Sequence, residues 1–514
     1  MQQSKNKQNQ KNIQQQGNRN RRRGIKNNKG KNRNQHQKAR QEMRKANRKV
    51  KVDTSHVQMT KEFRRGLDLI SQGRSVLISG SAGTGKSTFI EMVKNSGAID
   101  LSSTLIVAPT GTAAVNIGGT TIHKAFSLYP GTYYYQVAEG THKVAKDKFR
   151  VLKAVKTLII DEISMVRSDL LDMVDVILKR AKRNSRPFGG VQVILVGDML
   201  QLPPIVQSAE KRMLKQHWGS PYFTSSKSYK KAKITQVNLT KPFRQNEQEF
   251  LDLLHMVRNG TIDQDHIDKL NDLCYDPDFT PDNNSVTLAA KRNTVERINN
   301  QGLRKLGQKV YEEKATYDGT AKSNMFVGSD TLRFSLGARV MLIYNDPEGA
   351  FVNGSLGTII AYKQEYYEGL KNTKAYKKHT SKVESQLEAK AKLEANTSPT
   401  IVSILLDNGS IVDVNKHTWE VKQPYEANGK IASKTVGTIR QYPFILAWAM
   451  TVHKAQGKSI DNLHIELTGG MFAEGQFYVA LSRGTNLKGI TFSQPVTKRM
   501  IKVDPNLVEK FGNL

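Results

Sequence analysis

The glycine-rich stretch GSAGTGKS at residues 80–87 constrains the fold of this chain more than any other feature. It follows a short apolar run, SVLIS at 75–79, and opens an amphipathic segment, STFIEMVKNSG. A loop of the form G-x-x-x-x-G-K-S between a strand and a helix cradles phosphates, because its backbone N–H groups turn inward at a helix N-terminus. The chain is therefore predicted to be an α/β protein with a P-loop.

The P-loop gives a role to its polar side chains. Lys86 is expected to reach the β- and γ-phosphates of ATP, and the Ser87 hydroxyl is expected to ligate Mg²⁺. The predicted nucleotide-binding residues are Gly80, Ser81, Ala82, Gly83, Thr84, Gly85, Lys86, Ser87 and Thr88. The alternative is a chance glycine-rich turn, and the strand and helix on either side argue against it.

Two adjacent acids follow another apolar run, in LIIDE at 158–162. With a P-loop nearby, Asp161 is predicted to hold Mg²⁺, directly or through water. Glu162 is predicted to orient or deprotonate the attacking water. The alternative for the pair is a helix N-cap.

A third polar segment, VGDMLQLPP at 196–204, ends the next apolar run. It places Asp198 and Gln201 at the carboxyl edge of the same predicted sheet, where doubly wound folds bind ligands. Gln201 is predicted to hydrogen-bond the γ-phosphate and the attacking water, and so to report the nucleotide state. The alternative is an ordinary turn before Pro-Pro.

Apolar runs alternate with helical segments from about residue 60, as in buried parallel strands joined by helices. A first set of predicted strands comprises SVLIS (75–79), TLIVAP (104–109), TLIID (157–161) and VQVILVGD (191–198). A second set comprises ITQVNLT (234–240), SVTLAAKR (285–292), ARVMLIYN (338–345), FILAWAM (444–450) and NLHIEL (462–467). Two α/β sheets are therefore expected.

Two Asn-Gly turns, at 353–354 and 408–409, lie within alternating apolar segments and predict hairpins of a small inserted β-barrel. The segment 363–399 between them is rich in Lys, Glu, Gln and Tyr, and both a helical arm and a mobile loop fit it. The expected division is a tail at 1–52, a first α/β domain at 53–225, a second at 226–345 and 441–514, and the barrel at 346–440.

The charge is strongly positive, with a formal net value of +33, and residues 1–51 hold 18 Lys or Arg against one acid, Glu42. Such a balance indicates a polyanionic partner. The tail has too few apolar side chains to offset its ordering entropy, so it is predicted to be disordered. It is either a non-specific nucleic-acid arm or a solvated tail.

The single cysteine, Cys274, excludes an internal disulfide and a cysteine-cluster metal site. No apolar run has the length of a membrane span, and the N-terminus lacks the core of a secretion signal. The chain is expected in the cytoplasm of a bacterial or phage-infected cell, beside the nucleoid, rather than in a nucleus or mitochondrion.

The order of the motifs resembles that of the superfamily-one DNA helicases of the Pif type, with RecD and Dda helicases as more distant relatives. The matching segments are GSAGTGKS (80–87), APTGTAAVNIGGTTIH (108–123), IIDEISM (159–165), GDMLQLPP (197–204), LTKPFRQ (239–245), FVNGSLGTI (351–359), TVHKAQGKS (451–459) and YVALSRG (478–484). DEISM and APTGTAAVNIGGTTIH favour the Pif type over the Rep/UvrD type. The resemblance spans roughly residues 60 to 510.

The resemblance implies an ATP-dependent 5′-to-3′ translocase on single-stranded DNA that unwinds duplexes in replication, repair or recombination. It implies two RecA-like domains with ATP in the cleft between them, and a Src-homology-type barrel in the second. The expected partners are single-stranded DNA and duplex junctions, bound by a monomer, and replication or repair proteins. The rivals are a Rep/UvrD-type enzyme of opposite polarity and a nucleic-acid-binding switch that uses ATP only to change shape.

Two arginines in these segments, Arg244 and Arg483, face the γ-phosphate across the cleft in the family. Their predicted role is to stabilise charge that develops during hydrolysis. The alternatives are a surface salt bridge for Arg244 and a helix-end cation for Arg483. The predicted catalytic residues are thus Lys86, Asp161, Glu162, Gln201, Arg244 and Arg483.

The DNA track is predicted to cross both α/β domains through contacts to sugar and phosphate. Its predicted residues are Pro109, Thr110, Asn116, Thr121, His123, Thr451, His453, Lys454 and Gln456, with Ser459 beside them. The family also inserts a wedge, expected here at about 126–150. Phe126, Tyr129 and the run Tyr133 to Tyr135 either stack bases and split the duplex there or form a small core.

One position departs from the family pattern. Family members carry an adenine-recognising Gln about 17 residues before the first P-loop glycine, where this chain has Phe63. Phe63 either packs beside the base or faces the core, and the core is the preferred interpretation. Selectivity for adenine does not follow from this sequence.

Overall fold

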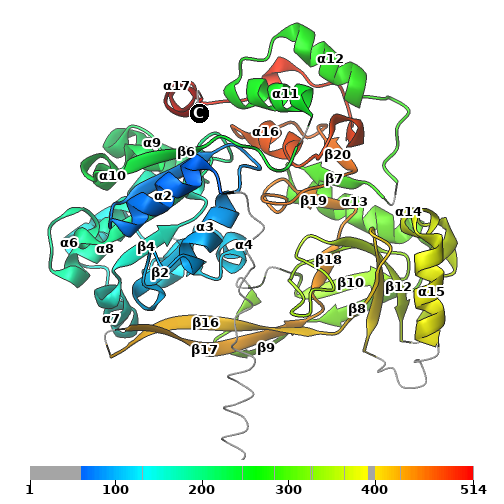
Figure 1. Ribbon diagram of the computed structural model, residues 1–514, viewed down its shortest axis with the longest axis horizontal. Helices are drawn as coiled ribbons and strands as arrows, with labels where there is room; N and C mark the ends of the chain where they lie inside the picture. Colours follow the sequence, from blue (N-terminus) through cyan, green and yellow to red (C-terminus); the bar gives the residue numbers. More distant parts are fainter. Residues whose placement is uncertain are drawn as a thin grey trace, which may run out of the picture. The chain divides into compact units, whose positions relative to one another are not determined.

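The computed structural model describes residues 59–512 apart from 130, 246, 283, 324, 325, 327, 364, 392–399 and 429. The predicted tail at 1–52 and the end of the segment 363–399 therefore lie outside the described residues. Two parallel sheets and a set of antiparallel strands organise the rest (Figure 1).

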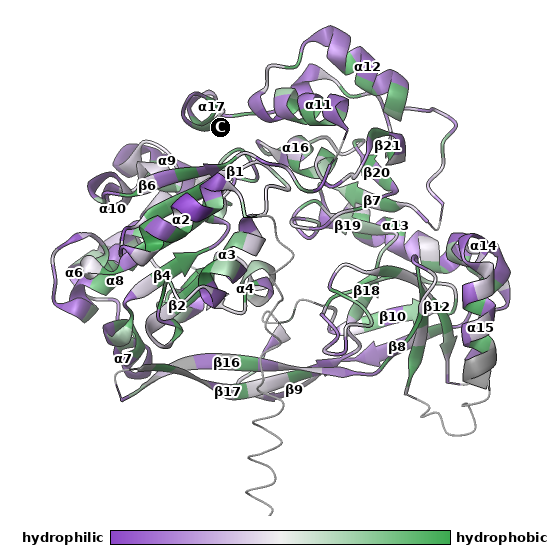
Figure 2. Cartoon of the chain, in the orientation of Figure 1, coloured by the Kyte–Doolittle hydropathy of each residue, from purple (hydrophilic) through white to green (hydrophobic). Residues whose placement is uncertain are grey.

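The first sheet has six strands, all paired in parallel. Its order is β3 (Thr120–Thr121), β2 (Thr104–Ala108), β4 (Thr157–Ile160), β5 (Gln192–Gly197), β1 (Val76–Gly80) and β6 (Thr235–Leu239). The four predicted strands of the first set are confirmed. The apolar character of β1, β2 and β4 is visible in Figure 2.

Helices cover both faces of this sheet, as the two separate hydrophobic cores show. One face carries α2 (Lys61–Ser71), α3 (Lys86–Asn95) and α4 (Gly111–Asn116). The other carries α5 (Ile122–Ala125), α6 (Tyr134–Glu139), α7 (Lys146–Ala154), α8 (Ser168–Lys182) and α10 (Lys227–Lys231), and α9 (Ser208–Trp218) precedes α10. The arrangement is doubly wound.

The second parallel sheet is smaller than predicted. Its order is β19 (Ala449–Thr451), β7 (Val286–Ala289), β20 (Leu463–Glu466) and β21 (Ile490–Phe492). Its core includes residues of α11 (Gln248–Asn259), α12 (Gln264–Cys274) and α16 (Gln476–Leu481). Helix α13 (Arg292–Lys305) follows β7, and α17 (Pro505–Phe511) packs on the core of the first sheet.

Two predicted members of this second sheet lie elsewhere. The strand expected at 234–240 is β6, which pairs with β1 from Val76↔Thr235 to Gly80↔Leu239. The first sheet thus extends past the expected boundary at residue 225. The strand expected at 338–345 is β11 (Arg339–Leu342) of an antiparallel sheet. An apolar run reports burial but not which sheet buries it, so these assignments were wrong.

The run at 444–450 is two strands rather than one. Its first half is β18 (Phe444–Leu446) of the antiparallel sheet, and its second half is β19 of the parallel sheet. The chain changes sheet at Ala447 and Trp448. The Trp448 ring lies against Gly302, where an added Cβ would come within 2.5 Å of the ring. This packing involves residues far apart in sequence, so no local sequence pattern predicts the change of sheet at Ala447 and Trp448.

The inserted β-structure surrounds one core. Its main sheet has the order β15 (Ile411–Val414), β14 (Val402–Leu406), β12 (Leu356–Tyr362), β11 and β18, with β13 (Glu365–Tyr366) on β12. A second antiparallel pair, β8 (Val310–Lys314) and β10 (Thr331–Ser335), packs on it. The predicted limits 346–440 leave out four of these strands. Both Asn-Gly turns are confirmed, with Gly354 at φ 103° and Gly409 at φ 76°.

Two further features complete the described chain. A long hairpin of β16 (His417–Ala427) and β17 (Lys430–Gln441), with β9 (Thr316–Gly319), was not predicted, and its Gln423 donates to Asp147 of α7 (Figure 1). The segment from 363 holds α14 (Lys374–Lys378) and α15 (Thr380–Ala391), so its described part is a helical arm. Among the described helices, none is long and apolar enough to cross a membrane.

Candidate nucleotide site and nucleic-acid track

The P-loop connects β1 to α3 in the predicted manner. Gly83 and Gly85 adopt left-handed conformations, with φ of 82° and 83°, and Gly85 is the N-cap of α3. The Lys86 ammonium donates to the carbonyls of Gly80 and Ser81 at 2.9 and 2.8 Å. The loop is therefore folded around its own lysine, and that lysine must leave these carbonyls to reach a phosphate.

The two acids after β4 lie beside this lysine. Burial raises the pKa of Asp161 to about 6, although Lys86 opposes the shift. Burial, and then the charge of Asp161, raise the pKa of Glu162 to about 7. Burial lowers the pKa of Lys86 against the attraction of Asp198 and the two acids. Carboxylates and an amine whose charges are this strongly coupled are typical of a reactive centre.

Glu162 does not cap the short helical turn that follows it. Its backbone is left-handed, with φ of 50°, and its side chain makes no capping hydrogen bond. Instead its carboxylate accepts a hydrogen bond of 3.1 Å from Gln456 Nε2. The N-cap alternative is therefore excluded for this residue.

Asp198, at the end of β5, is the centre of a buried polar network. Its carboxylate accepts from Arg258 Nη2 at 3.1 Å, from Gln201 Nε2 at 3.0 Å and from the Tyr478 hydroxyl at 3.2 Å. Burial alone would raise the pKa of Asp198, but Arg258 and Lys86 outweigh it and the pKa lies below its usual value. Asp198 is thus a buried anion that orients Gln201.

Gln456, which was predicted to contact DNA, lies at the nucleotide site. Its Nε2 donates both to Glu162 and to Gln201 Oε1, each at 3.1 Å. The prediction had placed Gln456 among DNA contacts, yet its described partners are two predicted catalytic residues. The segment 451–459 therefore reaches the nucleotide site.

Arg483 is buried, with 1% of its surface exposed, and it forms no ion pair with a described acidic side chain. Its guanidinium donates to the Val479 carbonyl at 2.8 Å and to the Ser482 hydroxyl at 2.8 Å. Burial, and then the charge of Arg244, lower its pKa to about 9. The charges of Glu162 and Asp198 act on this guanidinium without pairing with it, so it is suited to an anion that binds directly.

Arg244 lies in the loop between β6 and α11, just after the last strand of the first sheet. It donates to the carbonyls of Ser482 and Gly457, both at 3.2 Å, and burial lowers its pKa. An added Cβ on Gly83 would come within 2.9 Å of its Cβ. Arg244 therefore packs directly on the P-loop while donating to Gly457 and Ser482, and it forms no ion pair with a described acidic side chain.

Three predicted DNA-binding threonines cap short turns. The hydroxyls of Thr110, Thr121 and Thr451 accept from backbone N–H groups three residues on, at 3.2 to 3.3 Å. Each hydroxyl keeps its own proton, which can be donated to a phosphate oxygen. Thr451 is buried, whereas Pro109, His123 and Lys454 are at least partly exposed. Burial lowers the pKa of His123, His453 and Lys454.

Asn116 takes part in a polar chain that joins three segments. Asn353, in the turn between β11 and β12, donates to Asn116 Oδ1 at 3.2 Å and accepts from Lys458 Nζ at 2.9 Å. Burial lowers the pKa of Lys458 to about 8. The chain brings α4, the barrel turn and the segment after Gln456 to one place.

The predicted wedge region divides into core and surface residues. Phe126 is fully buried in the core of the first sheet, so it is no candidate for stacking on bases. Tyr134 packs edge-on against Trp218, with ring centroids 5.3 Å apart. The exposed rings are those of Tyr129, Tyr133 and Tyr135, of which the last two stack on each other at 5.8 Å.

Phe63 is a core residue, which confirms the preferred interpretation. It is buried on α2, with its ring 5.5 Å from that of Phe89 and 6.4 Å from that of Phe243. It also limits the space beside Gly85, where an added Cβ would lie 3.1 Å from the Phe63 ring.

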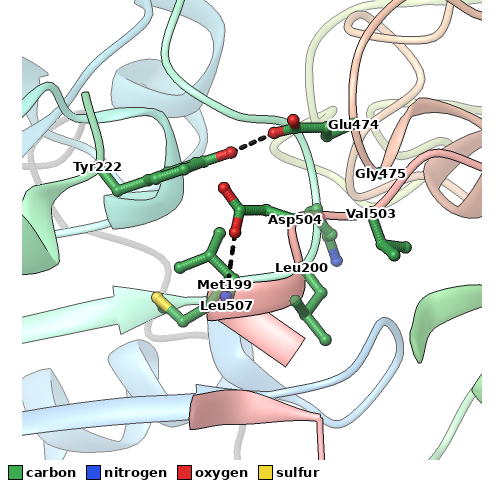
Figure 3. A pocket seen from close by; sticks show the side chains of 9 residues that line it. Met199, Leu200, Tyr222, Glu474, Gly475, Val503, Asp504 and Leu507 are labelled. Carbon is green, nitrogen blue, oxygen red and sulfur yellow. Dashed lines mark hydrogen bonds between the residues drawn. The ribbon is translucent and has the colours of Figure 1, made fainter. Parts of the chain in front are cut away.

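A small cavity lies behind Gln201, between Tyr222, Glu474 and Asp504 (Figure 3). Its volume of about 10 Å³ holds about one water molecule, so it is a packing gap and not a ligand site. The Tyr222 hydroxyl donates to Glu474 across it, and burial with this bond raises the pKa of Tyr222. Gly475, next to Glu474, packs on the backbone of Gln201.

Sequence reasoning missed five residues of this site. Tyr478, Asn353, Lys458 and Gln245 lie within segments singled out as motifs, but no chemistry was assigned to them. Arg258 had no signal, since a cation on an amphipathic helix is normally exposed. Gln245 is buried, and its Nε2 donates to the carbonyls of Ser482 and Gly484 at 3.2 and 2.9 Å.

Comparison with known proteins agrees with this geometry. The family model described as PIF1-like helicase matches residues 58–268. Pif1 from Bacteroides sp, solved in complex with ADP-AlF4, is 30% identical, with a TM-score of 0.73 over 88% of this chain and 96% of that one. The chain belongs to the PIF1-like helicase family.

Two further relatives of this family bear on function. Bacteroides Pif1 solved bound to single-stranded DNA is 30% identical, with a TM-score of 0.60 over 88% of this chain and 96% of that one. The ATP-dependent DNA helicase RRM3 of Saccharomyces cerevisiae is 30% identical over 84% of this chain and 65% of its own length. This PIF1-like chain spans just under two thirds of the length of the first such curated relatives.

Proposed function

We propose that this chain is an ATP-dependent DNA helicase that moves 5′ to 3′ along single-stranded DNA and unwinds duplexes in replication, repair or recombination. The observation that carries the proposal is the pair of hydrogen bonds from Gln456 to Glu162 and Gln201. They connect a segment with predicted DNA contacts to residues that would act on the γ-phosphate. Relatives named as ATP-dependent DNA helicases support it.

Hydrolysis would use the residues of the nucleotide site in the following roles. Lys86 turns from the P-loop carbonyls to the β- and γ-phosphates. Glu162 orients or deprotonates the attacking water, and Gln201 hydrogen-bonds that water and the γ-phosphate. Arg244 and Arg483 supply positive charge where the transition state develops negative charge. Because Arg244 donates to the Ser482 carbonyl and Arg483 to the Ser482 hydroxyl, they would move together.

The donor set also fits Mg²⁺. This ion is held in NTPases by one or two protein oxygens plus substrate phosphates rather than by an all-protein cage. Ser87 and Asp161 would provide those oxygens, and bound Mg²⁺ would neutralise charge on the phosphates. Among the described residues, no group of three or more His, Cys, Asp or Glu side chains forms a separate metal site.

Hydrolysis would need residues from segments beside both parallel sheets. Movement along DNA would follow from this requirement. Thr110, Asn116 and Thr121 would grip the strand from the first sheet, and Thr451 and Lys454 from the second. Closure around ATP would slide one grip past the other, and hydrolysis would release it. Each opened base-pair step costs about 1.4 kcal/mol of stacking on average, so hydrolysis should be coupled to DNA.

A pair of partial duplexes tests this proposal. One carries a 5′ single-stranded tail and the other a 3′ tail, and strand separation is measured with ATP and Mg²⁺. We expect unwinding only of the 5′-tailed substrate, and strong stimulation of ATP hydrolysis by single-stranded DNA. Unwinding of the 3′-tailed substrate would indicate the Rep/UvrD type, and hydrolysis independent of DNA would contradict a translocase.

The remaining features of the proposal concern cellular context. The protein would act as a monomer at junctions of single-stranded and duplex DNA, with replication or repair proteins nearby. It would work in the cytoplasm of a bacterial or phage-infected cell, at the nucleoid. The buried Cys274, whose pKa burial raises to about 12, is compatible with such a reducing compartment.

A further inference from the structure

The helical arm on the barrel carries four exposed lysines within eight residues: Lys371, Lys374, Lys377 and Lys378. On α14, positions 374, 377 and 378 are spaced i, i+3 and i+4, so they share one side of the helix. Lys371 lies three residues before the first of them, in a separate 3-10 helix (Glu368–Asn372) that the extended Thr373 joins to α14. We call these four residues the arm lysine face.

The opposite side of the arm is anchored in an apolar cluster. Ala375 and Tyr376 are buried with Val383 of α15 against Ile360 of β12 and Leu405 of β14. Alternate residues of the same strands, such as Ile359 and Ile404, face the barrel core instead. The arm therefore covers the outer face of the barrel sheet, beside β12 (Figure 1).

Polar contacts hold the arm in one position. Lys382 Nζ donates to the Asn408 carbonyl at 3.2 Å and to the Ser410 hydroxyl at 3.0 Å. Gln386 donates to the Gly409 carbonyl at 3.1 Å and accepts from the backbone N–H of Ile411 at 3.0 Å. The lysines are thus presented by a fixed support, which lowers the entropy cost of using them together.

The arm lysine face is uncompensated. No acid occurs between Glu368 and Glu384, and none of the four lysines forms an ion pair with a described acidic side chain. Glu384 itself accepts a hydrogen bond of 2.5 Å from the Tyr376 hydroxyl. Four like charges within eight residues repel one another, so a polyanion that bound there would relieve this repulsion.

We propose that the arm lysine face binds the phosphate backbone of duplex DNA. The inference rests on the proposed helicase function and adds to it a duplex contact outside the single-strand track. Surfaces for single strands combine positive charge with aromatic rings on which bases stack. Between Lys371 and Lys378 the one aromatic ring, Tyr376, is buried. This face therefore offers positive charge without a ring for base stacking, which suits contact with the phosphate backbone of a duplex.

The test replaces all four lysines by glutamine, which removes charge but keeps side chains of similar length. The matched control replaces Lys211, Lys215, Lys230 and Lys231, which are exposed on α9 and α10, and changes the net charge equally. The affinity of the full chain for a blunt duplex and for a single strand is measured between about 50 and 200 mM salt.

Each lost phosphate contact lowers the slope of log affinity against log salt by about 0.9. We expect the duplex slope of the arm variant to be shallower by roughly three to four, with single-strand affinity and single-strand-stimulated hydrolysis unchanged. An unchanged duplex slope, or a change equal to that of the control, would overturn the proposal. An equal loss on single strands would overturn the assignment to a duplex.

Failure of this proposal and failure of the helicase function are distinguishable. If wild-type protein does not hydrolyse ATP in response to single-stranded DNA, the proposed function is wrong whatever the arm binds. If single-stranded DNA stimulates hydrolysis normally, but the arm variant and the control variant show the same salt dependence of duplex affinity, the arm inference alone is wrong.

Discussion

The Tyr478 hydroxyl lies 2.8 Å from the backbone nitrogen of Ala82 and accepts its N–H. The same hydroxyl donates to Asp198 Oδ2 at 3.2 Å. A side chain of α16, which also leads to Arg483, thus binds both the P-loop and the acid that orients Gln201. A movement of the P-loop on nucleotide binding would therefore act directly on the helix that precedes Arg483.

Removal of this hydroxyl should weaken the link between the P-loop and α16 but leave ATP binding intact. Tyr478→Phe leaves the ring in place but deprives a buried N–H and a buried carboxylate of a partner, which costs about 1–3 kcal/mol. We expect a lower kcat for DNA-stimulated hydrolysis with little change in the Kd of ATP. Tyr229→Phe is the control, since Tyr229 packs on Phe223 with ring centroids 5.0 Å apart. If both variants behave as wild type, Tyr478 only fills space.

The buried charge of Arg483 should lower the stability of the fold and promote hydrolysis. Its guanidinium forms no ion pair with a described carboxylate, and burial lowers its pKa to about 9 despite the charges of Glu162 and Asp198, so the folded state holds an unfavourable cation. Arg483→Met keeps the volume and removes the charge. We expect an unchanged or higher Tm, retained ATP binding, and hydrolysis reduced by about 10³–10⁵. A Tm that falls by several degrees, with ATP binding lost, would show that Arg483 is structural.

Motifs whose geometry is local could be predicted from the sequence. The P-loop glycines need positive φ wherever the chain goes, and Asn353-Gly354 makes its turn for the same reason. Asp161 and Glu162 were identified because a P-loop requires an acid at the end of a neighbouring strand.

Features set by distant packing could not be predicted. The run at 444–450 is apolar in both sheets that it enters, and it changes sheet where Trp448 packs on the distant Gly302. Gln456 was assigned to DNA because its segment has that pattern, whereas its amide reaches Glu162, which is 294 residues away in sequence. No periodicity within one segment encodes such a pairing.

Gly475 should be required for contact between α16 and Gln201. It has φ of 65°, and an added Cβ would lie 2.4 Å from the Leu200 carbonyl oxygen and 2.7 Å from that of Gln201. Gly475→Ala is expected to destabilise the fold by about 2–4 kcal/mol in urea unfolding, because strain at positive φ and displaced backbone add. Gly470→Ala separates the two effects, since Gly470 has φ of 71° but open space around it. Equal losses for both variants would mean that the contact with Gln201 contributes nothing.

Lys458 should make binding of single-stranded DNA depend on pH. Burial lowers its pKa to about 8 in the free protein, where Asn353 is its hydrogen-bond partner. A phosphate beside Lys458 would favour the charged form and raise this pKa, so the bound state would hold more protons than the free state. Affinity should therefore fall as the pH rises from about 7 to 9, measured by fluorescence anisotropy at constant ionic strength.

Two variants assign that dependence to Lys458. Lys458→Arg keeps a cation that stays charged through this range, so its affinity should be nearly independent of pH. Lys458→Met should bind single-stranded DNA weakly at every pH, because methionine carries no charge. Asn353→Ala leaves the lysine but removes its neutral partner, and it should shift the pH dependence rather than abolish it. If Lys458→Arg retains the full wild-type dependence, the titrating group lies elsewhere and Lys458 does not contact the phosphate.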